Sequence, residues 1–253
     1  MLNNTTKSKL QDMKLGVMAA AFTKQEKDSA FSSMSFEERF GLIVDAEWDE
    51  RRNRRLTRLI KQADFVYSNA CVEDIEYLQD RKLDKAMITT LSSCNYIAEK
   101  HNVIILGATG SGKTYIANAL GISACRNYLS VKYIRLPDLL GEIAVARSEG
   151  AYRKVIKLYK QVQLLIIDEW LLIRLTETES RDLLEIVEAR YKRASTIFCS
   201  QFEIAGWHGK ISEPPLADAI CDRIAHDSYT IFIDGNESMR KRKGLSDDKV
   251  ISE

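Results

Sequence analysis

The sequence predicts an α/β protein, in which a five-stranded parallel sheet with helices on both faces follows a small all-helical domain. Three observations lead to this prediction. Proline is absent from the first 136 residues, so this part of the chain can be largely helical. From Asn102 onward, short apolar runs alternate with helical periods, which is typical of parallel strands buried on both faces. The run "VIIL" leads directly into the glycine-rich stretch "GATGSGKT", which marks the core as that of a P-loop NTPase.

The N-terminal helical region is marked best by residues 35–65. Ser35 and Glu38 have the spacing of a capping box. Apolar residues then recur at steps of three and four, as on an amphipathic helix; they are Phe36, Phe40, Ile43, Val44 and Trp48. One or two helices also fit residues 7–28, and residues 70–99 are expected to be helical and to connect to the core.

The second half of the chain contains the alternation of strands and helices. The predicted strands are residues 103–107, 131–136, 162–168, 196–200 and 229–233. The helices expected between them are residues 113–127, 137–147, 151–160, 177–194 and 214–226. After Ile233 only 20 residues remain, so we expect no full C-terminal lid of helices.

The glycine-rich stretch fits the motif G-x-x-x-x-G-K-[ST]. Its glycines allow backbone N–H groups to surround a phosphate at a helix N-terminus, where the helix dipole favours negative charge. Lys113 is expected to reach the β- and γ-phosphates, and the Thr114 hydroxyl to bind Mg²⁺. The predicted nucleotide-binding residues are Gly107, Ala108, Thr109, Gly110, Ser111, Gly112, Lys113, Thr114 and Tyr115.

The stretch "LLIIDE" supplies the second half of a nucleotide site. Asp168 follows four apolar residues at the end of a predicted strand, where α/β proteins bind ligands, and is expected to hold Mg²⁺ through water. Glu169 could polarise the attacking water, and the adjacent acids favour ATP hydrolysis. Ser200 ends the fourth predicted strand and is either a sensor beside the γ-phosphate or a plain turn residue. The expected cofactors are therefore ATP and Mg²⁺.

The formal net charge is only +1, so any affinity for nucleic acid must come from local patches. One basic cluster lies in residues 51–61 and comprises Arg51, Arg54, Arg55, Arg58 and Lys61. A second comprises Arg147, Arg153, Lys154, Lys157 and Lys160. Either cluster could be a solvated helix face or a surface that contacts DNA phosphates. Neither offers a set of residues suited to reading bases, so we expect contacts to the backbone of duplex DNA.

Three parts are therefore expected along the chain: residues 1–66 as an N-terminal helical domain that binds DNA or a partner, residues 67–100 as a helical connector, and residues 101–253 as the ATPase domain.

The five cysteines are an odd number without C-x-x-C spacing, which favours a reducing compartment. No 18-residue apolar span and no signal-peptide core occur. We expect a cytoplasmic protein without a membrane partner.

Several longer stretches resemble the IstB family, the helper ATPases of insertion-sequence transposition. They include "GATGSGKTYIANALG", "LLIIDEW", "SQF…WH" and "PPLADAICDRIAHDSYTIFIDGNESMRK". The N-terminal "SFEERFGLIVDAEWDERRNRRLTRLIKQADF" resembles the helical domain of that family, so the similarity spans roughly residues 10–243. The IstB family is related to DnaC helicase loaders and, more distantly, to DnaA initiators.

The resemblance implies an AAA+ ATPase that forms a homo-oligomer on DNA and cooperates with a DDE (IstA-like) transposase. By position, Ser200 matches sensor 1, Arg223 matches the arginine finger, and Arg240 matches a sensor-2-like arginine. On its own, Arg223 could instead be a C-terminal helix charge. Many family members read "DD" or "DEWG" at the acidic motif, whereas this chain reads "DEWL". The resemblance therefore does not predict how the chain continues after that strand.

Three functions remain compatible with these residues. The first is an ATP-dependent transposition helper that selects the target and recruits and stimulates the transposase. The second is a DnaC-like helicase loader or replication initiator. The third is a non-catalytic scaffold that ATP switches onto DNA. Gene neighbourhood would separate the first two, and single-turnover hydrolysis would separate the first from the third.

Overall fold

The computed structural model describes residues 2–235 and 238–239. By its internal contacts the chain divides into two compact units, Met1–Arg58 and Leu59–Glu253. The division falls inside helix α3, Phe36–Ala63, close to the boundary at residue 66 expected from the sequence. The three-part division into functional domains stays a prediction.

The N-terminal unit is helical, with α1 (Leu2–Asp12), α2 (Gly16–Lys27) and most of α3. The predicted capping box is confirmed, since Glu38 N donates to Ser35 Oγ and Ser35 N donates to Glu38 Oε2. The buried Glu47 carboxylate accepts hydrogen bonds from the backbone N–H groups of Val17 and Met18, at the start of α2. This carboxylate therefore caps α2 and holds it against α3.

The prediction of helix throughout residues 70–99 is wrong for the first half of that segment. It contains only two short 3₁₀ turns, Val72–Asp74 and Gln79–Arg81, before α4 (Lys85–Ser92) and α5 (Asn95–Ala98). Tertiary contacts override the local helical tendency: Tyr67 N donates to Asn118 Oδ1, and Cys71 N donates to the Tyr115 hydroxyl. Helix α4 begins where Asp84 caps the N–H of Met87.

The predicted sheet of five parallel strands is confirmed, and the structure gives the strand order as β2-β3-β4-β1-β5. The strands are β1 (Asn102–Gly107), β2 (Val131–Arg135), β3 (Leu164–Trp170), β4 (Ser195–Ser200) and β5 (Ser228–Ile233). Strand β4 lies between β1 and β3, so the ends of these three strands are neighbours at the carboxyl edge of the sheet.

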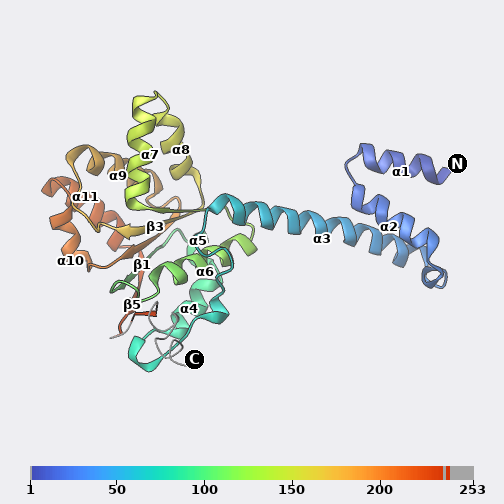
Figure 1. The fold of residues 1–253 in the computed structure, drawn as a ribbon, viewed down its shortest axis with the longest axis horizontal. Coiled ribbons are helices and arrows are strands. Elements are labelled where there is room, and N and C mark those ends of the chain that lie inside the picture. Colours follow the sequence, from blue (N-terminus) through green and yellow to red (C-terminus); the bar gives the residue numbers. More distant parts are fainter. Residues whose placement is uncertain (1, 236–237, 240–253) are drawn as a thin grey trace, which may run out of the picture. The chain divides into compact units, whose positions relative to one another are not determined.

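Helices cover both faces of the sheet (Figure 1). Their bounds are α6 (Lys113–Arg126), α7 (Leu136–Ser148), α8 (Tyr152–Gln161), α9 (Glu177–Arg190), α10 (Ile204–Trp207) and α11 (Pro214–Ala225). Helix α6 packs closely enough on one face that a Cβ at Gly121 would lie 2.8 Å from Cδ1 of Ile166. The neighbouring Leu165 and Ile167 face the other side, where they join α7, α9 and α11 in the core.

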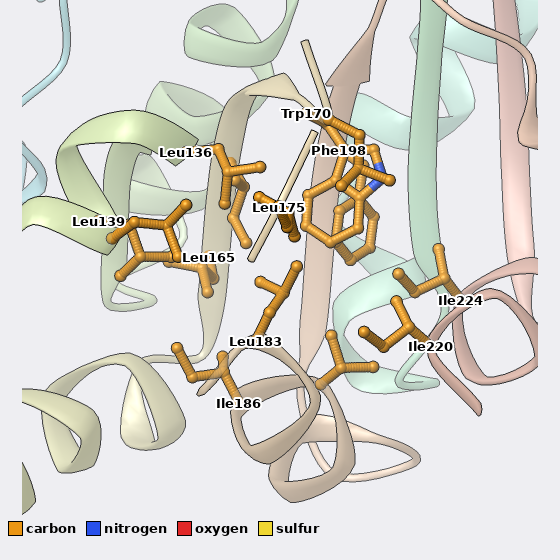
Figure 2. Packing of buried hydrophobic residues seen from close by; sticks show 14 of the residues in the cluster. Leu136, Leu139, Leu165, Trp170, Leu175, Leu183, Ile186, Phe198, Ile220 and Ile224 are labelled. Carbon is orange, nitrogen blue, oxygen red and sulfur yellow. The ribbon is translucent and has the colours of Figure 1, made fainter. Parts of the chain in front are cut away.

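Figure 2 shows the core on the face opposite α6. Leu165, Trp170 and Phe198 come from the sheet, and Leu136, Leu139, Leu183, Ile186, Ile220 and Ile224 come from the helices around it. The Trp170 and Phe198 ring centroids are 4.5 Å apart in an edge-on arrangement. This packing fixes the end of β3, which carries the acidic pair.

Candidate nucleotide site

The loop between β1 and α6 forms a phosphate cradle at the N-terminus of a 14-residue helix. Gly112, the residue before the helix, has φ +98°, a conformation that favours glycine. Gly107 also has a steric reason to be glycine, because a Cβ there would lie 2.7 Å from the Ile233 carbonyl oxygen of β5. Backbone conformation therefore requires a glycine at residue 112, and close packing requires one at residue 107.

Lys113 is buried at the start of α6, and its side chain reaches back over the loop. Its Nζ donates to the carbonyl oxygens of Gly107 at 2.7 Å and of Ala108 at 2.8 Å. The ammonium group is thus held beside the cradle, where it can meet a phosphate. Thr109 is exposed in the same loop.

Thr114 and Asp168 meet at the cradle although they are 54 residues apart in the sequence. The Thr114 hydroxyl donates to Asp168 Oδ2 at 2.6 Å. The same carboxylate oxygen accepts a hydrogen bond from the Tyr133 hydroxyl at 2.9 Å. Burial, and next the nearby Asp168 carboxylate, raise the pKa of Tyr133 well above its usual range, so the phenol stays a neutral donor. No motif in the sequence marks Tyr133 as part of the site.

Asp168 and Glu169 form a β-bulge. Ile167 pairs with Phe198 and Trp170 pairs with Ser200, so two residues of β3 oppose one residue of β4. The sequence prediction ended this strand at Asp168, whereas β3 continues to Trp170. Glu169 has φ +54°, which is unusual for a residue with a side chain, and such strain is commonly found at functional sites.

Glu169 forms an ion pair with Arg135, a residue that the sequence analysis did not single out. Arg135 Nη2 donates to Glu169 Oε2 at 2.7 Å. The hydrogen bond to Glu169 is the main reason that the pKa of Arg135 is raised. Arg135 ends β2, next to β3 in the sheet. The sequence prediction placed it one residue before the end of the strand at residues 131–136, and this position was the only sequence signal for it.

A pocket of ≈ 440 Å³ opens beside the cradle. On one side it is lined by loop and helix residues, namely Gly110, Gly112, Lys113, Thr114, Tyr115 and Ile116. On the other side it is lined by Tyr67, Asp74, Ile75, Glu76 and Arg81, together with Met239. The connector therefore forms a wall of the pocket, because its first half is not a helix. The volume of the pocket is in the range typical of small-molecule sites.

Ser200 lies at the carboxyl edge, but its hydroxyl is occupied within the fold. The residue is fully buried, and its Oγ donates to the Trp170 carbonyl at 3.2 Å. It also accepts hydrogen bonds from Phe202 N and from the Trp207 indole, both at 3.1 Å. These contacts tie β4 to the exit of β3; its role as a sensor stays a prediction.

Of the two arginines matched by family resemblance, the structure describes Arg223. Arg223 lies in the last turn of α11, donates to the Ala219 carbonyl, and pairs with Glu188 of α9 at 2.7 Å. To act as an arginine finger it would have to leave Glu188. Arg240 lies outside the described residues.

The two basic clusters each contain an arginine that is tied into the fold. Arg51 Nε donates to the buried Glu47 at 2.7 Å, and its Nη2 donates to the Lys14 carbonyl. Arg147 pairs with Asp182 of α9 and lies 4.4 Å from the Tyr152 ring centroid. The remaining members are exposed, except for the half-buried Lys160: Arg54, Arg55, Arg58 and Lys61 on α3, and Arg153, Lys154 and Lys157 on α8.

The strand order, the phosphate cradle and the paired Thr114 and Asp168 define a P-loop ATPase of the AAA+ class. Comparison with known families is more specific. The profile of the family described as IstB-like ATP binding protein matches residues 8–246, and the chain belongs to this family. The resemblance expected from the sequence is therefore confirmed, and the protein is an ATP-binding AAA+ ATPase.

Named relatives agree with this assignment. The chain is 39% identical, over 96% of its length and 98% of that protein, to the "Putative insertion sequence ATP-binding protein y4pL" of Sinorhizobium fredii. It is 41% identical, over 79% of its length and 87% of that protein, to the "Insertion sequence IS1162 putative ATP-binding protein" of Pseudomonas fluorescens.

Solved structures share the fold at low identity. AMPPCP-bound DnaA from Aquifex aeolicus gives a TM-score of 0.58 at 20% identity, covering 71% of this chain and 54% of that chain. The DnaC helicase loader gives a TM-score of 0.56 at 18% identity, covering 66% of this chain and 98% of that chain. Within the part of the chain that the structure describes, no helix is long and apolar enough to cross a membrane.

Proposed function

We propose that this chain is the ATP-dependent helper of an insertion-sequence transposase. It assembles as a homo-oligomer on duplex DNA, selects the target, and recruits and stimulates a DDE transposase. The observation that supports this most strongly is the family match over residues 8–246, because it includes the N-terminal helical unit as well as the ATPase core. Relatives that carry "insertion sequence" in their names cover nearly the same span.

The residues at the cradle suit hydrolysis of ATP bound with Mg²⁺. Thr114 and Asp168 present a hydroxyl and a carboxylate 2.6 Å apart, which are the hard oxygen ligands that Mg²⁺ prefers beside phosphates. When bound there, the ion would neutralise phosphate charge. Lys113 would meet the β- and γ-phosphates, and Tyr133 holds the Asp168 carboxylate in place.

Glu169 is the base that would orient the attacking water. In the described structure its carboxylate is paired with Arg135, so release from Arg135 is a step by which the ATPase could be switched on. Arg223 would complete the site of a neighbouring subunit, which requires an oligomer.

The exposed basic residues of α3 support contact with the DNA backbone. Arg54, Arg55 and Arg58 recur at helical spacing on one side of α3. Since the net charge is only +1, affinity should arise from such patches repeated over many subunits. Contacts of this kind bind unrelated sequences about equally and weaken steeply with salt.

Replacement of Arg54, Arg55 and Arg58 by Ala tests this surface. Binding of unrelated duplexes should weaken to a similar extent, and the slope of log affinity against log salt should flatten by about 2 to 3, at about 0.9 for each phosphate that the protein no longer neutralises. The measurement is fluorescence anisotropy at several salt concentrations, with a non-hydrolysable ATP analogue present.

A matched variant removes the same charge from the other helices of the unit. Lys9, Lys24 and Lys27 are exposed on α1 and α2, and their replacement by Ala should leave the slope close to that of the parent. If the two triple variants behave alike, or if neither changes the slope, the α3 surface does not carry the DNA.

A further inference from the structure

A buried arginine of the connector reaches the phosphate cradle from outside the nucleotide motif. Arg81 ends the 3₁₀ turn Gln79–Arg81 and is only 5% exposed. Its Nη1 donates to the Glu76 carbonyl at 2.6 Å, and its Nη2 donates to the Ser111 carbonyl at 2.8 Å. One planar guanidinium thus connects the connector to the loop that surrounds the phosphates.

The contact fixes the orientation of one peptide unit in the cradle. In a planar trans peptide the C=O and the N–H point in opposite directions. The Ser111 carbonyl is held by Arg81, so the N–H of Gly112 points away from Arg81, and Gly112 lines the pocket. A Cβ on Gly112 would lie 3.0 Å from Arg81 Nη2, so the glycine also allows this close approach.

The same turn is anchored on its other side to the end of the sheet. The Arg81 carbonyl accepts a hydrogen bond from Asp234 N at 3.0 Å, directly after β5. Lys82 pairs with the Asp234 side chain at 2.8 Å on the surface. The backbone hydrogen bond to Asp234 therefore holds Arg81 from a second direction, whereas the exposed Lys82 pair adds little to that hold.

Arg81 and Lys113 line the same pocket, so two cations lie at the site that the cradle offers to phosphates. A buried positive charge there favours a bound anion. We propose that Arg81 is a positioning residue of the nucleotide site, which orients the Ser111–Gly112 peptide toward the phosphates and adds positive charge behind it. This inference rests on the ATP site and not on the proposal for DNA.

The expected effect is on nucleotide affinity, not on the chemical step. The P-loop N–H groups surround the α- and β-phosphates, so ADP and ATP should lose affinity equally. Arg81→Met keeps the apolar volume and should raise the Kd for both nucleotides about tenfold, and raise the KM for ATP in proportion, while kcat stays within about threefold of the parent. Arg81→Lys keeps the positive charge but not the planar guanidinium that makes two hydrogen bonds, so it should recover part of the lost nucleotide affinity.

The experiment is calorimetric titration of the full chain, without DNA, with ADP and with a non-hydrolysable ATP analogue. Lys82→Met is the matched control, because it removes a charge from the same turn without touching the loop, and it should bind like the parent. Circular dichroism and the melting temperature without nucleotide report whether each variant folds.

Four results would overturn the proposal. The first is parent-like affinity for both nucleotides in a folded Arg81→Met variant. The second is a loss confined to the ATP analogue, which would place the charge at the γ-phosphate. The third is an equal loss in Lys82→Met. The fourth applies if Arg81→Met does not fold, and it is parent-like affinity for both nucleotides in Arg81→Lys. That result would mean that Arg81 supports the fold and does not position the phosphate loop.

Discussion

Leu171, the first residue after β3, allows the backbone strain at the end of this strand to be measured. Leu171 has φ +51° and is fully buried in the core, two residues after Glu169. A left-handed conformation costs a residue with a side chain about 1–2 kcal/mol, and glycine does not incur this cost. Leu171→Ala retains the strain and leaves a cavity, whereas Leu171→Gly also leaves a cavity but relieves the strain.

Leu183 of α9 provides the comparison, because it is fully buried in the same core but lies within a regular helix. At Leu183 the Gly variant should be less stable than the Ala variant by about 1 kcal/mol. At Leu171 the Ala variant alone pays the cost of the left-handed backbone, which offsets this difference. We define the Gly-minus-Ala value as the free energy of unfolding of the Gly variant minus that of the Ala variant at the same position. This value should be about 1–2 kcal/mol higher at residue 171 than at residue 183.

The assay is equilibrium unfolding in urea of the four variants without nucleotide. All four should be less stable than the parent, since truncation of a buried leucine costs about 2–5 kcal/mol. The informative quantity is the difference between the two Gly-minus-Ala values, in which the cavity terms largely cancel. If that difference is within about 0.3 kcal/mol of zero, within the additivity error for separate sites, the backbone at residue 171 is not strained.

Two further predictions concern the chemistry. Glu169→Gln should bind ATP like the parent but show no turnover in a single-turnover assay, because the base that orients water is lost; near-normal turnover would remove Glu169 from the mechanism. Arg223→Ala subunits mixed with Lys113→Ala subunits should regain part of the hydrolysis that each lacks alone, because the intact groups meet at mixed interfaces. Glu188→Ala, which removes only the partner of Arg223, should keep its activity, and full activity of Arg223→Ala at every protein concentration would exclude an arginine finger.

Local sequence was sufficient for the elements of the core and for the glycine-rich loop between β1 and α6. Each strand is a short apolar run, and each run ends where the structure ends the strand to within two residues. The phosphate loop was recognisable because one contiguous stretch must provide the turn, the glycines and the lysine. Asp168 was recognisable because it follows a buried strand, and parallel strands place their carboxyl ends together.

Residues 67–84 could not be assigned correctly from their sequence. Their composition permits helix, but in the described structure they form bends, turns, 3₁₀ turns and irregular segments with contacts to α6 and the phosphate loop. The apolar face of α3 also differs from expectation. Phe36 and Trp48 are 75% and 60% exposed, although their spacing predicts a buried stripe. Periodicity gives the face of a helix and does not say what covers it.

The sequence by itself determined the class of fold, the phosphate cradle and the two acidic residues, because these depend on short segments whose periodicity and motif spacing are local. Tertiary structure alone decided that Tyr133 and Arg135 hold Asp168 and Glu169, and that Arg81 holds the phosphate loop. These partners are 30 to 35 residues apart in the chain. Their contacts arise from strand order, a bulge in β3 and a non-helical connector. Each of these follows from packing over the whole core, so no short stretch of sequence specifies it.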